Sequence, residues 1–305
     1  MINVTVIGFG NVGSVLSVML LNAIQDIRLN IMDPEPTLEG AFLDLNHGMP
    51  LFRSAELHIN DPDLFEEAYF VFYTAGTPNK HGGSRLSTAK KNIELTKEIF
   101  EGVRFKKEPY VIVITNPVDI VAHSVYQFSG LSAERVIGTG TLLESVRLSY
   151  YLAELTGYSM NHFNAMVLGE HGDSQVPIYS HTTLNGKLIS EFPKFDQKLL
   201  DKAKELTRTA AFQIRETQTG TTYGVAKCAL KIMQDLIGNE QHNYPLSVLT
   251  NQHYMDLLKI DHPIFISMPV SVSNNCISVR NLNDFNEEEL DAFRRSAVLL
   301  SDIIL

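Results

Sequence analysis

Short apolar runs alternate with helical patterns through the first half of the chain. The runs at residues 2–7, 29–32, 69–74 and 110–115 are rich in branched and aromatic side chains, as is typical of strands buried on both faces. Apolar residues at helical spacing follow, at 12–23, 86–100 and 119–128. Strands that alternate with helices are joined by right-handed crossovers, so this half is predicted to form a doubly wound parallel sheet of the α/β class.

The rhythm changes after about residue 140. Longer helical patterns cover 144–156, 197–218 and 223–237, with strand-like stretches at 163–168 and 264–272 and an amphipathic helix from 286 onward. This half is predicted to be mixed α/β. We therefore expect two domains, a nucleotide-binding domain at 1–140 and a catalytic domain at 141–305.

Composition narrows the possible partners. The chain has 305 residues, enough for two domains at roughly 150 residues each. Its 25 Lys and Arg face 35 Asp and Glu, for a formal net charge of −10, and no basic run is present. Because such a chain repels a phosphate backbone, we expect no nucleic-acid partner.

Several features indicate a cytoplasmic protein. Cys228 and Cys276 are the only cysteines, in no metal-type spacing, so we expect free thiols and no metal site. No apolar stretch approaches the ~20 residues of a membrane-spanning helix, and the N-terminus lacks the features of a signal peptide. We expect neither a membrane partner nor secretion.

A glycine motif is the first sign of chemistry. Gly8, Gly10 and Gly13 form G-x-G-x-x-G between the first predicted strand and the first predicted helix, and Asp33 follows 20 positions later at the end of the next strand. This arrangement is typical of dinucleotide binding: the glycines permit a tight turn, a close approach of the pyrophosphate and close helix–strand packing. The Asp33 carboxylate suits ribose hydroxyls and would repel a 2′-phosphate, which favours NAD over NADP.

Other candidate residues are individually ambiguous. His171 follows an apolar run and suits proton exchange, but a structural histidine is the commoner meaning of any one His. Glu144 and Arg147 are three apart on a predicted helix, as in many surface ion pairs. Arg85 ends a Gly- and Pro-containing loop and could be a solvated arginine. Asn116 ends the fourth predicted strand, where doubly wound sheets bind ligands.

Taken together, seven segments resemble the lactate/malate dehydrogenase family in the family's order and over essentially the whole chain. They are GFGNVG at 8–13, Asp33, TAGTPNKHGGSR at 74–85, NPVD at 116–119, GTGTLLESVR at 138–147, LGEHGDSQVP at 168–177 and TTYGVA at 221–226. The resemblance implies a Rossmann domain followed by a mixed α/β catalytic domain, and an NAD-dependent L-2-hydroxy acid dehydrogenase.

The resemblance also implies a role for each matching residue. His171 would exchange a proton with the substrate C2 oxygen, Arg147 would hold the substrate carboxylate, and Arg85 would polarise the carbonyl. Asn116 would contact the nicotinamide region and the substrate, and Thr221 would line the substrate pocket. The positions that would bind NAD are Gly8, Gly10, Asn11, Val12, Gly13, Asp33, Gly76, Asn116 and Thr139.

Two residues depart from the family's pattern. Glu144 stands where the partner of the catalytic histidine is normally aspartate, so one extra methylene must be accommodated. Asn79 stands where malate dehydrogenases place an arginine for the second carboxylate of oxaloacetate, so substrate-binding Asn79 favours a monocarboxylate such as pyruvate. A malate dehydrogenase, with Lys80 supplying the charge, and a dehydrogenase for a larger 2-oxo monocarboxylate stay as alternatives.

Two further expectations concern activity and assembly. Family members usually assemble through helical faces, so we expect a homo-oligomer, either a dimer or a tetramer. A non-catalytic NAD-binding sensor is the alternative from another class, because a fold alone does not establish chemistry. The presence of His171, Arg85, Arg147 and Asn116 favours the enzyme.

Overall fold

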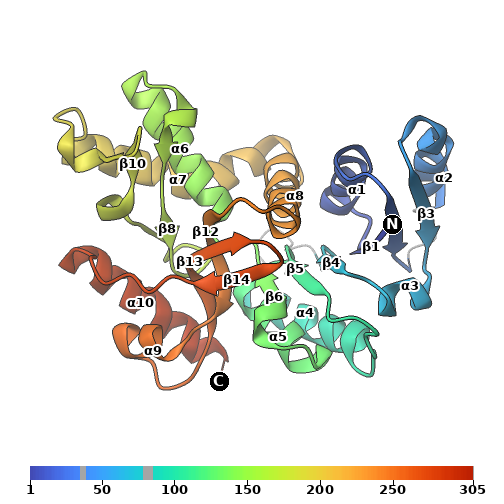
Figure 1. Ribbon diagram of the computed structural model, residues 1–305. Helices are drawn as coiled ribbons and strands as arrows, with labels where there is room; N and C mark the ends of the chain where they lie inside the picture. The colour runs from blue at the N-terminus through green and yellow to red at the C-terminus, as the bar shows by residue number, and fades with distance from the viewer. Residues whose placement is uncertain (35–38, 78–84, 305) are drawn as a thin grey trace. The chain divides into compact units, whose positions relative to one another are not determined.

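A computed structural model describes residues 1–34, 39–77 and 85–304 (Figure 1). The chain divides into two compact units. The N-terminal unit comprises residues 1–139 and 222–234, and the second unit comprises 140–221 and 235–305. The predicted division at residue 140 is sequential, whereas the N-terminal unit also takes in 222–234, most of helix α8 (Tyr223–Ile237).

The N-terminal unit is built on a parallel sheet. Its strands lie in the order β3, β2, β1, β4, β5, β6, and each pair of neighbours is parallel. The bounds are β1 (Ile2–Ile7), β2 (Ile27–Met32), β3 (Ala55–Ile59), β4 (Phe70–Tyr73), β5 (Tyr110–Val113) and β6 (Val136–Gly138). The strand order reverses between β1 and β4, which is where sheets of this kind bind ligands, beyond the carboxyl ends of the strands.

Helices connect these strands. They are α1 (Asn11–Ala23), α2 (Glu39–Gly48), α3 (Pro62–Glu66), α4 (Arg85–Phe100) and α5 (Val118–Ser129). The elements predicted for this half differ from the observed ones by at most two residues at each end, but β3, α3 and β6 were not predicted. Helix α2 escaped prediction because it has no apolar stripe, and none of its residues, all of which the structure describes, is buried.

The second unit is mixed α/β. Strands β12 (His242–Leu249), β13 (Phe265–Ser273) and β14 (Cys276–Val279) form antiparallel pairs. Smaller antiparallel pairs join β7 (Phe163–Asn164) to β10 (Thr183–Leu184), β10 to β11 (Lys187–Leu188), and β8 (Val167–Leu168) to β9 (Val176–Pro177). Its helices are α6 (Leu142–Thr156), α7 (Gln197–Thr217), α9 (Gln252–Leu258) and α10 (Glu287–Ile304).

Local chemistry explains the main elements of this unit. Gly157 ends α6 in the left-handed conformation (φ +76°), and the Asp196 carboxylate begins α7 by accepting a hydrogen bond from the Leu199 N–H at 2.8 Å. Leu148, Leu152 and Val167 belong to a buried apolar cluster that packs α6 on the small strands. The α/β class, with a doubly wound sheet followed by a mixed α/β region, is confirmed.

One prediction for this half needs correction, and its strand β12 was missed. The strand predicted at 163–168 is two strands, because β7 pairs with β10 whereas β8 pairs with β9. Strand β12 was not predicted, since its sequence contains Pro245, which cannot donate to a ladder. In the sheet, Pro245 lies opposite Pro269 of β13.

Candidate active site

The glycine turn of the N-terminal unit joins β1 to α1. Gly8 has φ +92°, and a Cβ on it would lie 2.6 Å from the backbone nitrogen of Ala75. A Cβ on Gly13 would lie 1.9 Å from the carbonyl oxygen of Gly8, so no side chain fits there. A Cβ on Gly10 would meet nothing within 4 Å. The turn is therefore closed at Gly8 and Gly13 and open at Gly10, which is the pattern a cradle for a pyrophosphate requires.

Helix α1 begins at this turn. Its N-cap is Gly10, which has no side chain to accept from the first turn, and Asn11 and Val12 are the first helical residues. The first intrahelical bond runs from Ser14 N–H to Gly10 C=O at 2.9 Å. The backbone N–H groups at the helix N-terminus, together with its dipole, suit an anionic group.

Asp33 lies at the end of β2, next to the same turn. Its Oδ2 accepts a hydrogen bond from the Phe9 N–H at 2.7 Å, which fixes the carboxylate beside the glycines. Asn60 holds the Asp33 backbone from both sides, accepting from its N–H at 2.9 Å and donating to its carbonyl at 3.0 Å. A half-buried carboxylate placed in this way fits the ribose of a dinucleotide.

Gly76 and Asn116 follow β4 and β5, the neighbouring strands. A Cβ on Gly76 would lie 2.6 Å from the Thr115 methyl group. Asn92 of α4 is 1% exposed and joins the two segments, since its side chain donates to the Asn116 carbonyl at 2.7 Å and accepts from the Thr77 N–H at 2.9 Å. Sequence reasoning missed Asn92. The signal was a polar residue at helical spacing from the apolar residues Ala89 and Phe100.

Two predicted residues are not placed by the structure. Asn79 lies outside the described residues. Arg85 is the first residue of α4, but its side chain also lies outside the description.

Three predicted residues come together in the second unit. Glu144 and Arg147 lie in the first turns of α6, and Nη1 of Arg147 donates to Oε1 of Glu144 at 2.8 Å. His171 lies in the loop between β8 and β9, and its Nδ1 is 3.3 Å from Oε2 of Glu144. The Glu144 side chain is only 6% exposed, against 13% for Arg147 and 24% for His171. One buried carboxylate thus contacts both a guanidinium and an imidazole.

The charge of Glu144 follows from these contacts. Burial raises the pKa of its carboxyl, but the attraction of His171, its hydrogen bond and the charge of Arg147 outweigh that effect. The net pKa lies below the usual 4.5, so the group is a carboxylate at neutral pH. A carboxylate facing Nδ1 stabilises a protonated imidazole and leaves Nε2 to exchange a proton.

Hydrogen bonds hold α6 against β8, the strand that precedes the histidine loop. The Ser145 hydroxyl accepts from the Val167 N–H at 2.9 Å, and the Thr141 hydroxyl donates to the Val167 carbonyl at 2.5 Å. These buried contacts fix the separation of the Glu144 helix from the His171 loop.

Two predicted pocket residues lie where the chain passes between units. Thr139 is the last residue of the first segment of the N-terminal unit and is 5% exposed, and its N–H donates to the Val113 carbonyl at 2.9 Å. Thr221 is half-buried and precedes the return of the chain to that unit.

Comparison with known proteins agrees with this geometry. The profile of the lactate/malate dehydrogenase NAD-binding domain matches residues 2–138, and that of the family's α/β C-terminal domain matches residues 141–304. The chain belongs to the lactate/malate dehydrogenase family. The predicted family, the NAD cofactor and the NAD-dependent dehydrogenase acting on a 2-hydroxy acid are confirmed.

Individual relatives cover nearly the whole chain. An L-lactate dehydrogenase of Bacillus velezensis is 33% identical over 308 residues, 99% of this chain and 96% of the relative. Among solved structures, a minor L-lactate dehydrogenase from Enterococcus mundtii is 29% identical with a TM-score of 0.89 and covers 99% of this chain and 96% of that one. A malate dehydrogenase from Cryptosporidium parvum is 25% identical with a TM-score of 0.88 and covers 100% and 98%.

Within residues 1–34, 39–77 and 85–304, no group of three or more His, Cys, Asp or Glu is arranged to hold a metal ion. In the same part of the chain, no helix is long and apolar enough to cross a membrane.

Proposed function

We propose that this member of the family interconverts a 2-oxo monocarboxylate and the corresponding L-2-hydroxy acid, with pyruvate and L-lactate as the pair. The contact of Glu144 with both His171 and Arg147 carries the proposal. An imidazole and a guanidinium there contact the same carboxylate, and the reduction of a 2-oxo acid needs a proton carrier and a cation for the substrate carboxylate from a protein.

The residues of the second unit have separate tasks. The guanidinium of Arg147 binds the substrate carboxylate through a planar fork that lysine could not reproduce. Nε2 of His171 gives a proton to the C2 oxygen during reduction and removes it during oxidation. Glu144 stabilises the imidazolium, and Thr221 lines the pocket. When bound, NADH supplies the hydride that C2 accepts.

The residues of the N-terminal unit hold the cofactor. We assign the pyrophosphate to the turn of Gly8, Gly10 and Gly13 and the N-terminus of α1, including Asn11 and Val12, since this turn is open at Gly10. Asp33 accepts from the ribose hydroxyls. Gly76, Asn116 and Thr139 contact the rest of the cofactor, with Asn116 also near the substrate, and Arg85 polarises the substrate carbonyl.

The extra methylene of Glu144 does not prevent its contact with His171. With Nδ1 of His171 at 3.3 Å and Nη1 of Arg147 at 2.8 Å, glutamate uses one oxygen for each partner. The guanidinium is therefore oriented by Glu144 through Nη1 before substrate arrives, and its remaining N–H groups can bind the substrate carboxylate. This arrangement supports a working dehydrogenase over a cofactor-binding protein without activity.

Asn79 supports the choice of a monocarboxylate. An uncharged amide at this position cannot neutralise the second carboxylate of oxaloacetate, and an unpaired charge in a closed site is strongly unfavourable. Malate dehydrogenase activity and activity on larger 2-oxo monocarboxylates are the alternatives.

A steady-state panel of pyruvate, oxaloacetate and branched 2-oxo acids with NADH tests this proposal. We expect kcat/KM to be highest for pyruvate. We also expect Asn79→Arg to shift the ratio of kcat/KM toward oxaloacetate by about tenfold or more, and tenfold corresponds to roughly 1.4 kcal/mol. A wild-type preference for oxaloacetate would contradict the assignment. Absence of turnover with every acid, despite NADH binding, would support the non-catalytic alternative.

Assembly and location complete the proposal: a cytoplasmic homo-oligomer, either a dimer or a tetramer. Exposed apolar side chains support an interface on the N-terminal unit, because Leu43 of α2 is 53% exposed and Leu51 is 89% exposed. Sedimentation equilibrium measures the number of subunits, and fractionation of the source cells tests the location.

A further inference from the structure

We propose that Ser296 of helix α10 is a positioning residue for His171, through a closed ring of hydrogen bonds that fixes the β8–β9 loop. This inference rests on the proposed function, in which His171 moves the proton. Ser296 lies 125 positions after His171 and is 0% exposed, so nothing in the local sequence of the loop indicates it.

The first contact is between Ser296 and the residue next to His171. The Ser296 hydroxyl accepts a hydrogen bond from the Glu170 N–H at 2.8 Å. The Glu170 carbonyl in turn accepts from the Gly172 N–H at 2.8 Å, which closes a three-residue turn with His171 at its centre. The backbone on both sides of His171 is thereby tied to Ser296.

Donors and acceptors determine the direction of the ring. The Ser174 hydroxyl donates its single proton to the Glu170 carboxylate, and its oxygen lies 3.0 Å from the Ser296 oxygen. Ser296 must therefore donate to Ser174, while it accepts from the Glu170 N–H. The ring runs from Glu170 N–H to Ser296, to Ser174 and back to the Glu170 carboxylate, so each hydroxyl both donates and accepts.

Close packing supports the same role. Gly169 has φ +94°, and a Cβ on it would lie 2.7 Å from the Ser296 hydroxyl oxygen. On the other side, Gly169 exchanges two backbone hydrogen bonds of 3.1 Å with Ser267 of β13. The loop is held between a strand and a helix immediately before the histidine.

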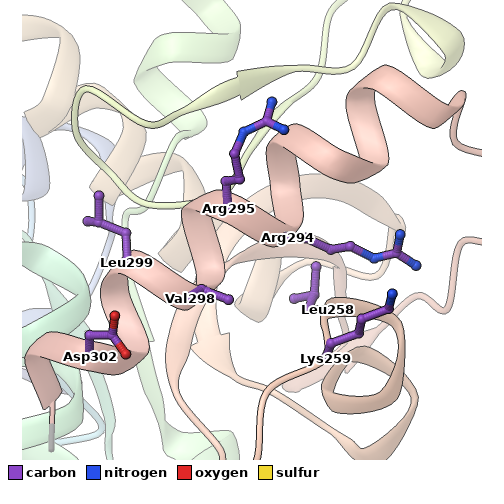
Figure 2. A pocket seen from close by; sticks show the side chains of 7 residues that line it. All are labelled: Leu258, Lys259, Arg294, Arg295, Val298, Leu299 and Asp302. Carbon is purple, nitrogen blue, oxygen red and sulfur yellow. The ribbon is translucent and has the colours of Figure 1, made fainter.

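Only the buried side of α10 takes part. Its exposed side carries Arg295, Val298 and Leu299, which with Leu258 and Lys259 line a pocket beside α9 (Figure 2). Ser301, one and a half turns beyond Ser296, is also buried, but its hydroxyl contacts Nε2 of His262 at 3.2 Å. Ser301 is therefore a matched control: the same residue type, helix and burial, without the loop.

The test compares Ser296→Ala, Ser174→Ala and Ser301→Ala in the complete chain with the 2-oxo acid that the wild type reduces best. We expect Ser296→Ala to lower kcat by about 10- to 100-fold, since displacement of a reacting group by roughly 1 Å can cause such losses. KM for the acid and the Kd of NADH stay within about twofold, because Arg147 and the glycine turn are untouched. We expect Ser174→Ala to lower kcat by a smaller factor than Ser296→Ala, and Ser301→Ala to keep the wild-type kcat.

A second measurement is independent of turnover and cofactor. Hydrogen exchange of the Glu170 and Gly172 amides in the free protein accelerates in Ser296→Ala and not in Ser301→Ala. A wild-type kcat and unchanged exchange in Ser296→Ala overturn the inference. If Ser296→Ala fails to fold, Ser174→Ala is the test in its place. A kcat of Ser174→Ala equal to that of the wild type then overturns the inference. A wild type without turnover contradicts the proposed function instead, and the exchange measurement then tests the ring.

Discussion

The two glycine-bearing turns of this protein, the β1–α1 turn and the β8–β9 loop, are held in position in opposite ways. In the first, a Cβ on Gly13 would meet the Gly8 carbonyl and a Cβ on Gly8 would meet the Ala75 backbone, so the constraint is the close approach of backbone segments. In the second, the residue beside His171 is fixed by a side chain 126 positions away. The cofactor turn requires the absence of side chains where backbone segments meet, whereas the catalytic loop requires the presence of one side chain from a distant helix.

The two regions also differ in how they handle charge. The cofactor turn offers backbone N–H groups at the start of α1, and its N-cap, Gly10, supplies no side-chain acceptor. The second region buries a carboxylate against a guanidinium and an imidazole. Dipoles suffice where the ligand brings the charge, but a proton carrier needs a fixed countercharge.

Removing the countercharge gives the largest expected effect. Glu144→Gln keeps the shape of the side chain, but the imidazolium and the Arg147 guanidinium then lose their carboxylate. We expect kcat to fall by about 10³-fold or more, as when a catalytic histidine loses its acidic partner. Stopped-flow reduction of the preferred 2-oxo acid measures this loss.

Glu144→Asp is the matched control, because it keeps the charge and shortens the side chain by one methylene. We expect kcat within about tenfold of the wild type, since aspartate pairs with one partner at least. Equal losses in both variants would show that side-chain length, and not charge, governs the site.

Gly13→Ala tests the backbone constraint at the β1–α1 turn. We expect it to have the next largest effect. The new Cβ would lie 1.9 Å from the Gly8 carbonyl oxygen, so the turn must move. We expect a loss of roughly 3 kcal/mol, a drop in Tm of about 6–12 °C, and NADH binding at least about tenfold weaker.

Gly40→Ala controls for the substitution itself. Gly40 lies within α2, and a Cβ there meets nothing within 4 Å, so alanine should raise stability by up to about 1 kcal/mol. Thermal unfolding and NADH titration of both variants separate the two outcomes. Similar behaviour of Gly13→Ala and Gly40→Ala would remove the basis for a backbone constraint at the turn.

The same contrast explains what the sequence could predict. The β1–α1 turn and Asp33 were accessible because strand, glycines, helix and acid follow one another at fixed spacing. The i,i+3 pair of Glu144 and Arg147 was accessible from helical periodicity, but its contact with His171 was expected only from the family resemblance. Asn92 left a weak signal as a polar residue on an apolar helical face.

Ser296 left none. A serine on the buried side of a helix has the same local pattern whether it satisfies its own helix or holds a distant loop, and only the fold decides. Helix α2 and strand β12 were missed for related reasons. The first has no apolar stripe and no buried residue, and the second contains a proline within a strand that its neighbours in the sheet support.

The smallest expected effect is a pH dependence of the free energy of unfolding that comes from Glu144 in the second region. The direction of this dependence follows from the pKa of the Glu144 carboxyl. The folded-state pKa of this carboxyl is lowered below 4.5, because His171 and Arg147 outweigh the burial that raises it. Its contribution to stability is therefore complete above pH 4.5 and is lost as the pH falls through the lower folded value. Urea unfolding of the wild type and Glu144→Gln between about pH 5.5 and about pH 3, below the ordinary titration range of histidine, measures the contribution as a difference. That difference should stay constant down to about pH 4.5 and then shrink. A difference that grows on acidification would mean that burial, and not the two cations, controls the proton on Glu144.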